Sequence, residues 1–179
     1  MNHPAPSRRQ RGVSLIECAI TITIVLLVAG FTLPSFEQLR QRRQLESTAA
    51  QLETDLQLAR SEAVSRNQSV RMDFQNDDQG SCYVVHDGDA GNCRCNGTAV
   101  PVCDEGVTPL RRVHLLARDG IELRSNSRSV LFDADKGTVT PTATLRLLSG
   151  VGALHQVINV MGRIRTCSPD AAVPGVRPC

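Results

Sequence analysis

Residues 13–33 constrain this chain more than any other feature, because they form an apolar run whose only charged side chain is Glu17. About 20 such residues are enough to cross a bilayer as a helix. Three arginines lie within residues 1–12, and the next basic residue is Arg40. Under the positive-inside rule, this distribution predicts that residues 1–12 face the cytoplasm and that the chain after the run lies on the other side.

Three interpretations of this run are open: a secretory signal peptide, a plain single-pass anchor, and a helix through which subunits assemble. The first two need only a basic start and an apolar stretch, and both are present. Neither gains from Glu17, because a carboxylate costs about 2.5–3.5 kcal/mol at the centre of a membrane helix and less near its end. A helix that assembles with neighbours does gain, since Glu17 can pair with a cation on another subunit.

The residues at the start of the run resemble the cleavage site of type IV prepilins, in which a short basic leader ends in glycine. Here Gly12 is followed by the sequence VSLIE. The resemblance implies that a prepilin peptidase cuts after Gly12 and methylates the new N-terminus at Val13. Glu17 is then the fifth residue of the mature chain, as in that family. Pro34 becomes the twenty-second, where pilins often carry a proline that kinks the helix.

The helical pattern continues beyond Pro34, because no Gly or Pro interrupts residues 35–66 and apolar residues recur every three or four positions. The stripe consists of Leu45, Ala49, Leu52, Leu56, Ala59 and Ala63. We expect this surface helix to pack on a sheet and to form one rod with residues 13–33, kinked at Pro34.

After Asn67 the apolar period changes to two, which predicts strands separated by turns rich in Asp and Gly. The predicted strands are 69–74, 82–86, 110–117, 121–124, 129–133, 138–140, 143–148, 155–160 and 163–166. One long helix followed by many strands predicts an α+β fold with an antiparallel sheet on the helix. The expected domains are a leader (1–12), a transmembrane and filament-core helix (13–39) and a periplasmic globular pilin domain (40–179).

Residues 58–70, with the sequence LARSEAVSRNQSV, resemble a run typical of the FimT and GspH group of minor pilins and pseudopilins. This resemblance covers most of the chain. It implies a pilin-like fold, an inner-membrane location with the C-terminal domain in the periplasm, and exposure outside the cell when the chain is in a pilus. The implied partners are other pilins in a filament, the prepilin peptidase and the inner membrane.

Seven cysteines argue against a reducing compartment. We interpret Cys18, inside the apolar run, as a small apolar residue. The other six allow 15 pairings: they are Cys82, Cys93, Cys95, Cys103, Cys167 and Cys179. We expect Cys167 and Cys179 to pair, because they bracket a C-terminal loop with three prolines and because pilins commonly close such a loop in this way. The other four would then pair within residues 82–103.

Zinc is the alternative for part of this set, with His86, Cys93, Cys95 and Cys103 as ligands. The Cys-x-Cys spacing fits structural zinc sites poorly, so we expect no metal and no cofactor. The chain also lacks the Gly-x-Ser-x-Gly elbow, the Walker loop and the His-Glu-x-x-His motif, so we expect no enzyme.

Charge is distributed unevenly, since residues 13–105 carry a net charge of −6 and residues 106–179 carry +5. Within the basic part, Arg163 and Arg165 would lie on one face of an extended strand, where two guanidiniums can bind neighbouring phosphates. The alternative from spacing alone is that both are solvated or pair with Asp133 or Asp135.

The residues Gly162, Arg163, Ile164 and Arg165 resemble the Gly-Arg-x-Arg motif implicated in DNA binding by FimT-type minor pilins during natural transformation. The resemblance implies double-stranded DNA as a partner, and Arg177 could extend the same basic face. We expect electrostatic, salt-sensitive binding, because no aromatic platform for base stacking is nearby. The alternative function is a structural pseudopilin of a type II secretion system, or a pilus-priming minor pilin that does not bind DNA.

Overall fold

The computed structural model describes residues 14–95, 101–169 and 173–179, without the side chains of residues 31–35. Contacts divide the chain into two units, Met1–Leu39 and Arg40–Cys179, and each is described by itself. The predicted cleavage site at Gly12 and Val13 lies outside the described residues.

A single helix, α1, runs from Leu15 to Arg66. The two predicted helices are therefore one continuous element, and the backbone passes through Pro34 in helical conformation. The kink at Pro34 stays a prediction. Among the described residues, no helical segment is long and apolar enough to qualify as a membrane span.

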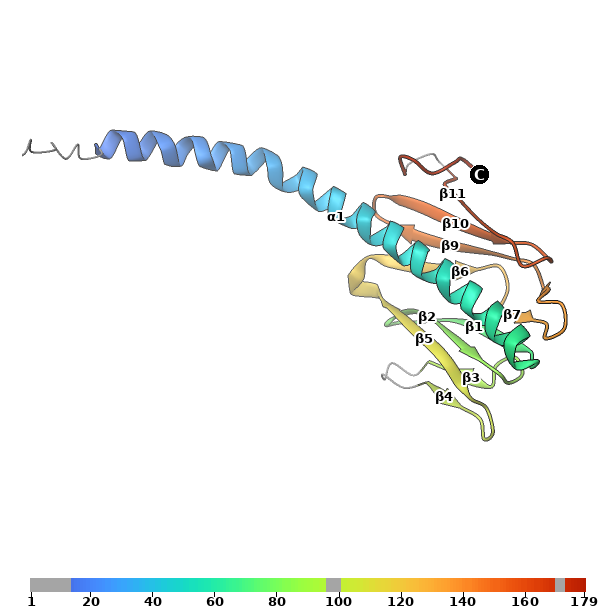
Figure 1. Ribbon diagram of the computed structural model, residues 1–179. Coiled ribbons are helices and arrows are strands. Elements are labelled where there is room, and N and C mark those ends of the chain that lie inside the picture. Colours follow the sequence, from blue (N-terminus) through green and yellow to red (C-terminus); the bar gives the residue numbers. More distant parts are fainter. Residues whose placement is uncertain (1–13, 96–100, 170–172) are drawn as a thin grey trace, which may run out of the picture. The chain divides into compact units, whose positions relative to one another are not determined.

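The second unit contains two antiparallel sheets and a small two-stranded ribbon (Figure 1). The first sheet has the order β5-β2-β1-β7-β8, with the bounds Pro109–Leu116, Gly80–His86, Val70–Asp77, Ser129–Phe132 and Val139–Thr140. The second has the order β11-β10-β9-β6, with the bounds Ile164–Cys167, Gly152–Ile158, Ala143–Ser149 and Ile121–Ser125. The ribbon pairs β3 (Cys93–Arg94) with β4 (Val102–Cys103), and a short 3₁₀ helix, η1, spans Ala117–Asp119. The predicted α+β fold class is confirmed.

Every predicted strand overlaps an observed one, but β3 and β4 were not predicted. Two-residue strands are too short to show an alternating pattern. Their pairing is accompanied by a covalent link, since Cys93 lies opposite Cys103 and the two form a disulfide.

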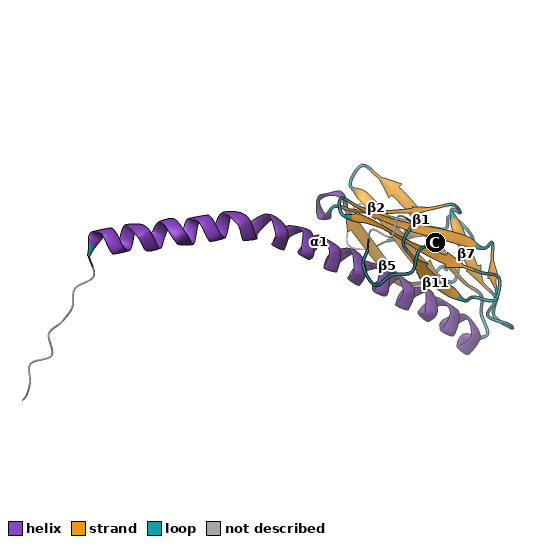
Figure 2. Ribbon diagram, turned by 90° about the horizontal axis from the view of Figure 1, so that it is seen from above, coloured by secondary structure: helices purple, strands orange, loops and turns teal. Residues whose placement is uncertain are grey.

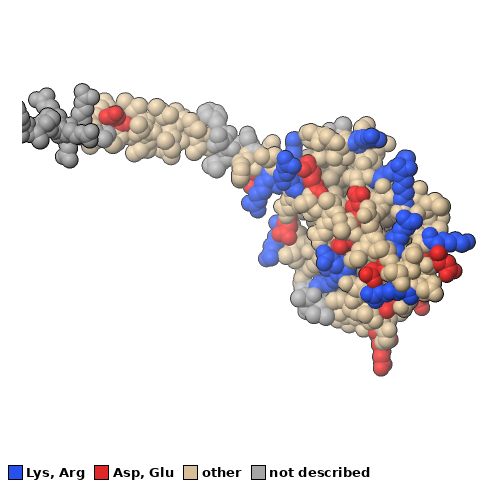
Figure 3. Space-filling view, viewed as in Figure 1, with Lys and Arg blue, Asp and Glu red and all other residues tan. Residues whose placement is uncertain are grey.

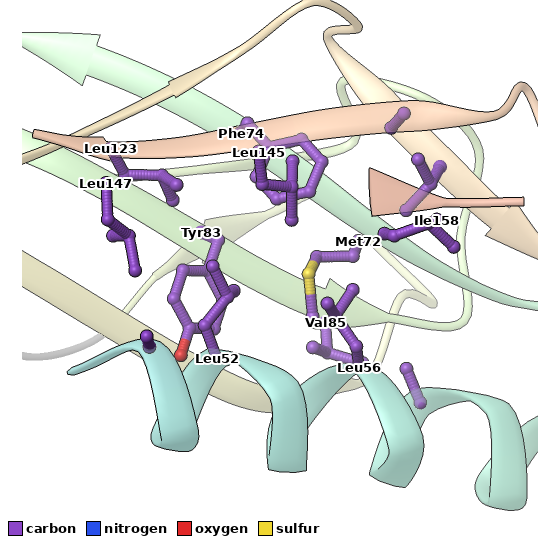
Figure 4. Packing of buried hydrophobic residues seen from close by; sticks show 14 of the residues in the cluster. Leu52, Leu56, Met72, Phe74, Tyr83, Val85, Leu123, Leu145, Leu147 and Ile158 are labelled. Carbon is purple, nitrogen blue, oxygen red and sulfur yellow. The ribbon is translucent and has the colours of Figure 1, made fainter. Parts of the chain in front are cut away.

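The predicted apolar stripe of α1 is confirmed, because all six of its residues are buried. Figure 2 shows the strands lying against the C-terminal part of the helix. In Figure 4, Leu52 and Leu56 point from the helix toward Met72, Tyr83 and Val85 of the first sheet. Three leucines and three alanines make up the stripe, and the small alanines allow the sheets to approach the helix closely.

Polar contacts join α1 to both sheets. The hydroxyl of Tyr83 on β2 donates to Asp55 Oδ2 at 2.7 Å, and Arg111 Nε on β5 lies 3.2 Å from Asp55 Oδ1. On the second sheet, Gln156 Nε2 on β10 donates to the backbone oxygen of Ala49 at 2.6 Å. Since Asp55, Tyr83 and Gln156 are all buried, these bonds hold the helix in one position along the sheets.

Candidate nucleic-acid interface

The predicted DNA-binding arginines lie on the hairpin that joins β10 to β11. The strands are antiparallel, with Ile158 opposite Ile164. In the loop between them, the N–H of Gly162 donates to the oxygen of Asn159, and the N–H of Asn159 donates to the oxygen of Arg163. The side chain of Asn159 also accepts the N–H of Arg163 at 2.9 Å. This is a tight turn closed by a residue in the left-handed conformation, and it fixes the backbone at Arg163.

Gly162 supplies that left-handed residue, with φ of +73°. It is also buried, and an added Cβ would lie 3.0 Å from Arg60 Nε and 3.1 Å from the oxygen of Gly137. Both its conformation and its surroundings therefore require glycine. Gly162 therefore shapes the turn that carries Arg163, and its role as a DNA contact stays a prediction. It lines the hollow beside Arg60 and Arg163, but not the one beside Arg165 and Arg177.

Replacing Gly162 by Ala should lower the free energy of unfolding more than replacing Gly120 by Ala. Gly120 has a similar φ of +70° but open space around it, so its variant should lose only the cost of the left-handed conformation, about 1–2 kcal/mol. Gly162→Ala adds the clash with Arg60, and we expect a further loss of about 1 kcal/mol or more. Denaturant unfolding followed by circular dichroism measures the free energy of unfolding of both variants. Equal losses would show that the contact with Arg60 does not matter.

Arg163 and Arg165 are exposed, whereas Ile164 between them packs against the hydrophobic core. This alternation is what an extended strand produces. Neither arginine makes an ion pair with Asp133 or Asp135 within the described chain. Oδ1 of Asp133 instead accepts the N–H groups of Asp135 and Lys136. The alternative pairing considered from the sequence is therefore not the one found.

The C-terminal tail brings Arg177 next to this pair. A disulfide joins Cys167 at the end of β11 to Cys179, which is the pairing that the family resemblance implies. The N–H of Ser168 donates to the oxygen of Arg177, and the N–H of Cys179 donates to the oxygen of Ser168. Buried Val173 anchors the tail between these points.

The result is one hollow lined by three exposed arginines, Arg163, Arg165 and Arg177, which we call the arginine surface. Thr166 and Val157 contribute to its walls. On the face shown in Figure 3, basic side chains are spread with acidic ones between them. The arginine surface places three guanidiniums around one hollow, an arrangement suited to phosphate groups.

The N-terminal assembly residues are described only in part. Glu17 is exposed and lies in the first turn of α1, where its N–H donates to Ser14 Oγ at 3.3 Å. Ser14 and Glu17 thus have the spacing of a helix-capping pair. A carboxylate in this turn is also favoured by the helix dipole.

The remaining predicted cysteines form two disulfides, Cys82–Cys95 and Cys93–Cys103. Three of the four candidate zinc ligands, Cys93, Cys95 and Cys103, are therefore in disulfides and cannot bind zinc as thiolates. The fourth, His86, is buried with Nε2 at 3.1 Å from Asp73 Oδ2, and its Nδ1 accepts the N–H of Gly88. Cys18 is an exposed free cysteine.

Comparisons with known proteins give three findings. The family described as type II transport protein GspH matches residues 48–162, which is more than half of the chain. The prokaryotic N-terminal methylation motif matches residues 7–33. A comparison with curated proteins gives no significant match.

Two crystal structures of the type IV minor pilin FimU of Pseudomonas aeruginosa have a similar fold. One is 24% identical with a TM-score of 0.52 and covers 75% of this chain and 96% of that chain. The other is 22% identical with a TM-score of 0.51 and covers 73% and 98%. At this level of identity the likeness concerns the fold alone.

Proposed function

The chain belongs to the GspH family of type IV minor pilins and pseudopilins, and from this premise we propose that it is a minor pilin that binds double-stranded DNA at the pilus for uptake in natural transformation. The family is one of structural pilins, not of enzymes. One observation carries the proposal: Arg163, Arg165 and Arg177 surround a single hollow, although Arg177 is separated from the other two in sequence.

The chemistry of that hollow suits the DNA backbone. Guanidiniums bind phosphate oxygens through charge-assisted hydrogen bonds, and these contacts do not depend on base sequence. No aromatic side chain lines the described part of the arginine surface, so base stacking contributes little. Binding should therefore weaken steeply with salt. A single copy binds weakly, and several copies in one filament raise the avidity where their geometry allows simultaneous contact.

Replacing both Arg163 and Arg165 by Gln should weaken DNA binding on the order of tenfold at low salt, because two phosphate contacts are lost. The measurement is fluorescence anisotropy of a labelled duplex titrated with the full chain in neutral detergent, at low and moderate NaCl. A variant with Arg94→Gln and Arg118→Gln is the matched control, since both arginines are exposed and lie on elements outside the second sheet and outside the arginine surface. It should bind within about twofold of the parent.

If the Arg163→Gln, Arg165→Gln variant binds as well as the parent, the DNA role is refuted. The alternative is then a structural one, as a pseudopilin of a type II secretion system or a pilus-priming minor pilin. The family description, type II transport protein, is the observation that favours this second function.

For assembly, we propose a single-pass inner-membrane helix with the C-terminal domain in the periplasm, and cleavage after Gly12 by the prepilin peptidase. The match to the N-terminal methylation motif supports this processing. N-terminal sequencing of the mature chain should then begin at Val13. Glu17 would pair with the methylated amine of Val13 in a neighbouring subunit, and Pro34 would set the course of the helix in the filament.

Replacing Glu17 by Gln should lower the amount of this chain in sheared filaments severalfold, because the amide keeps the size of the side chain but not its charge. Immunoblotting of filament and membrane fractions measures this loss. The control is Ser14→Ala, which removes the contact of the Ser14 hydroxyl with the N–H of Glu17 and keeps the carboxylate. Incorporation of Glu17→Gln at the parental level would show that the charge is not needed.

A further inference from the structure

A second hollow adjoins the arginine surface on the other side of Arg163. Its walls are the exposed face of α1 around Arg60, the turn between β7 and β8 with Asp135 and Lys136, and the hairpin at Arg163. We call this the helix groove and define it by these four residues. Because Arg163 lines both hollows, the helix groove is continuous with the arginine surface.

The position of Arg60 in the groove is fixed by backbone atoms of two loops. Its Nε donates to the oxygen of Gly137 at 2.9 Å. Gly162 lies against the same side chain, since a Cβ added there would be 3.1 Å from Arg60 Cδ. Gly162 in the hairpin therefore leaves room for the side chain of Arg60 on α1.

Lys136 is held by its own turn. Oδ1 of Asp133 accepts the N–H of Lys136 at 3.0 Å, and the N–H of Gly137 donates to the oxygen of Asp133. The ammonium group itself makes no ion pair with a described residue. Because the turn that carries Lys136 is already ordered, its backbone loses little conformational entropy when the ammonium group binds an anion.

The charges of the groove favour an anion over other ligands. Three cations surround it, and Asp135 is the one carboxylate among its described lining residues. No aromatic side chain lines the described groove, so it offers a base nothing to stack on. Guanidinium and ammonium groups arranged in this way match the oxygens of a phosphate group.

We propose that the helix groove is a second phosphate subsite, which takes the backbone of the same DNA duplex that the arginine surface binds. The duplex would then extend across Arg163 onto α1, with Lys136 and Arg60 as phosphate contacts and Asp135 as an opposing charge. This inference rests on the proposed DNA-binding function and enlarges its site from the C-terminal hairpin and tail to the long helix.

Two substitutions of opposite sign test it. Lys136→Gln should weaken binding about two- to fivefold at low salt and reduce the slope of log K against log [NaCl] by about 0.9, the value for one lost phosphate contact. Asp135→Asn should strengthen binding by a similar factor, because a repelling charge is removed. Neither side chain supports the fold through a hydrogen bond to a described residue, and thermal unfolding would verify that both variants are folded.

The matched controls make the same charge changes away from both hollows. Arg118→Gln and Asp119→Asn alter an exposed pair in η1 whose charged atoms are 4.0 Å apart. At about 0.1 M NaCl they should change the dissociation constant by less than about 1.5-fold, because the screening length is then about 10 Å. All four variants are measured as full chains in neutral detergent with the same labelled duplex.

The outcomes separate this inference from the proposed function. If Lys136→Gln and Asp135→Asn behave like their controls while Arg163→Gln with Arg165→Gln loses binding, the helix groove is not a subsite and the DNA role stands. If the parent chain does not bind the duplex, both proposals fail. Opposite shifts at positions 135 and 136, with the reduced salt slope, support the subsite.

Discussion

Tyr83 should remain protonated in the folded chain at pH 11, where most tyrosine of an unfolded chain is ionised. Its side chain is only 1% exposed, and burial is the main cause that raises its pKa far above the usual value of 10. The hydrogen bond to Asp55 and the negative charge of that carboxylate raise the pKa further, while the positive charge of Arg111 lowers it. We therefore expect the phenol to stay protonated as long as the helix is packed on the first sheet.

The composition of the chain makes this titration easy to observe. Tyr83 is its only tyrosine, and it contains no tryptophan, so tyrosinate absorbance near 295 nm reports this single site. We expect no tyrosinate signal from the folded chain at pH 11 and full ionisation in denaturant, with a midpoint near 10. A native midpoint near 10 would show that the phenol of Tyr83 is not buried between the helix and the first sheet.

The raised pKa also determines how stability depends on pH. Above pH 10 the unfolded chain binds fewer protons at this site than the folded chain, so the free energy of unfolding falls as pH rises. The fall should be about 1.4 kcal/mol per pH unit until the pKa of the folded chain is reached. Tyr83→Phe is the control, because it removes the ionisable group and should be free of this alkaline loss. Its absorbance should not change on titration.

The helix and strands of the second unit could be predicted because their signals are local. The six stripe residues of α1 repeat every three or four positions, and nine strands alternate with turns that contain Asp and Gly. Whether a helix or strand buries one face is visible in the spacing of apolar residues within a short segment, so this spacing is sufficient to predict the element. The ribbon of β3 and β4 escaped prediction because two-residue strands have no alternating pattern, and because the sequence alone cannot assign the Cys93–Cys103 disulfide that joins them.

The polar contacts of α1 could not be predicted as pairs, because their partners are distant in sequence. Asp55 contacts Tyr83 and Arg111 only after both strands have folded onto the helix. A signal was nevertheless present: Asp55 is three residues after Leu52 and four before Ala59, which places a carboxylate on the buried face. Such a residue requires buried partners.

The same limit applies to the candidate interface. The local pattern predicted that Arg163 and Arg165 share a face, but the position of Arg177 depends on the folded tail and its disulfide. The approach of Arg60 and Lys136 to Arg163 depends on contacts between α1, the β7–β8 turn and the hairpin. These are tertiary contacts with no sequence period.

Replacing Leu56 by Ala should destabilise the second unit by about 2–5 kcal/mol, because the side chain is fully buried and its loss leaves a cavity between α1 and the sheet. Leu58→Ala is the matched control, since the same atoms are removed two residues away. Leu58 is 36% exposed, so we expect a loss below about 1 kcal/mol. Urea unfolding of the full chain, followed by circular dichroism, gives both values.

Comparing Leu56→Ala with Leu58→Ala tests which face of α1 is buried, because side chains two residues apart on a helix are rotated by about 200° around its axis. Equal losses at Leu56 and Leu58 would mean that the helix does not bury one fixed face. That result would also weaken the argument for the helix groove, since Arg60 follows Leu56 by four residues and lies at the edge of the same face. Its bond to Gly137 requires this rotation of the helix. A large loss at Leu56 with a small loss at Leu58 supports the position of Arg60 as well as that of the core.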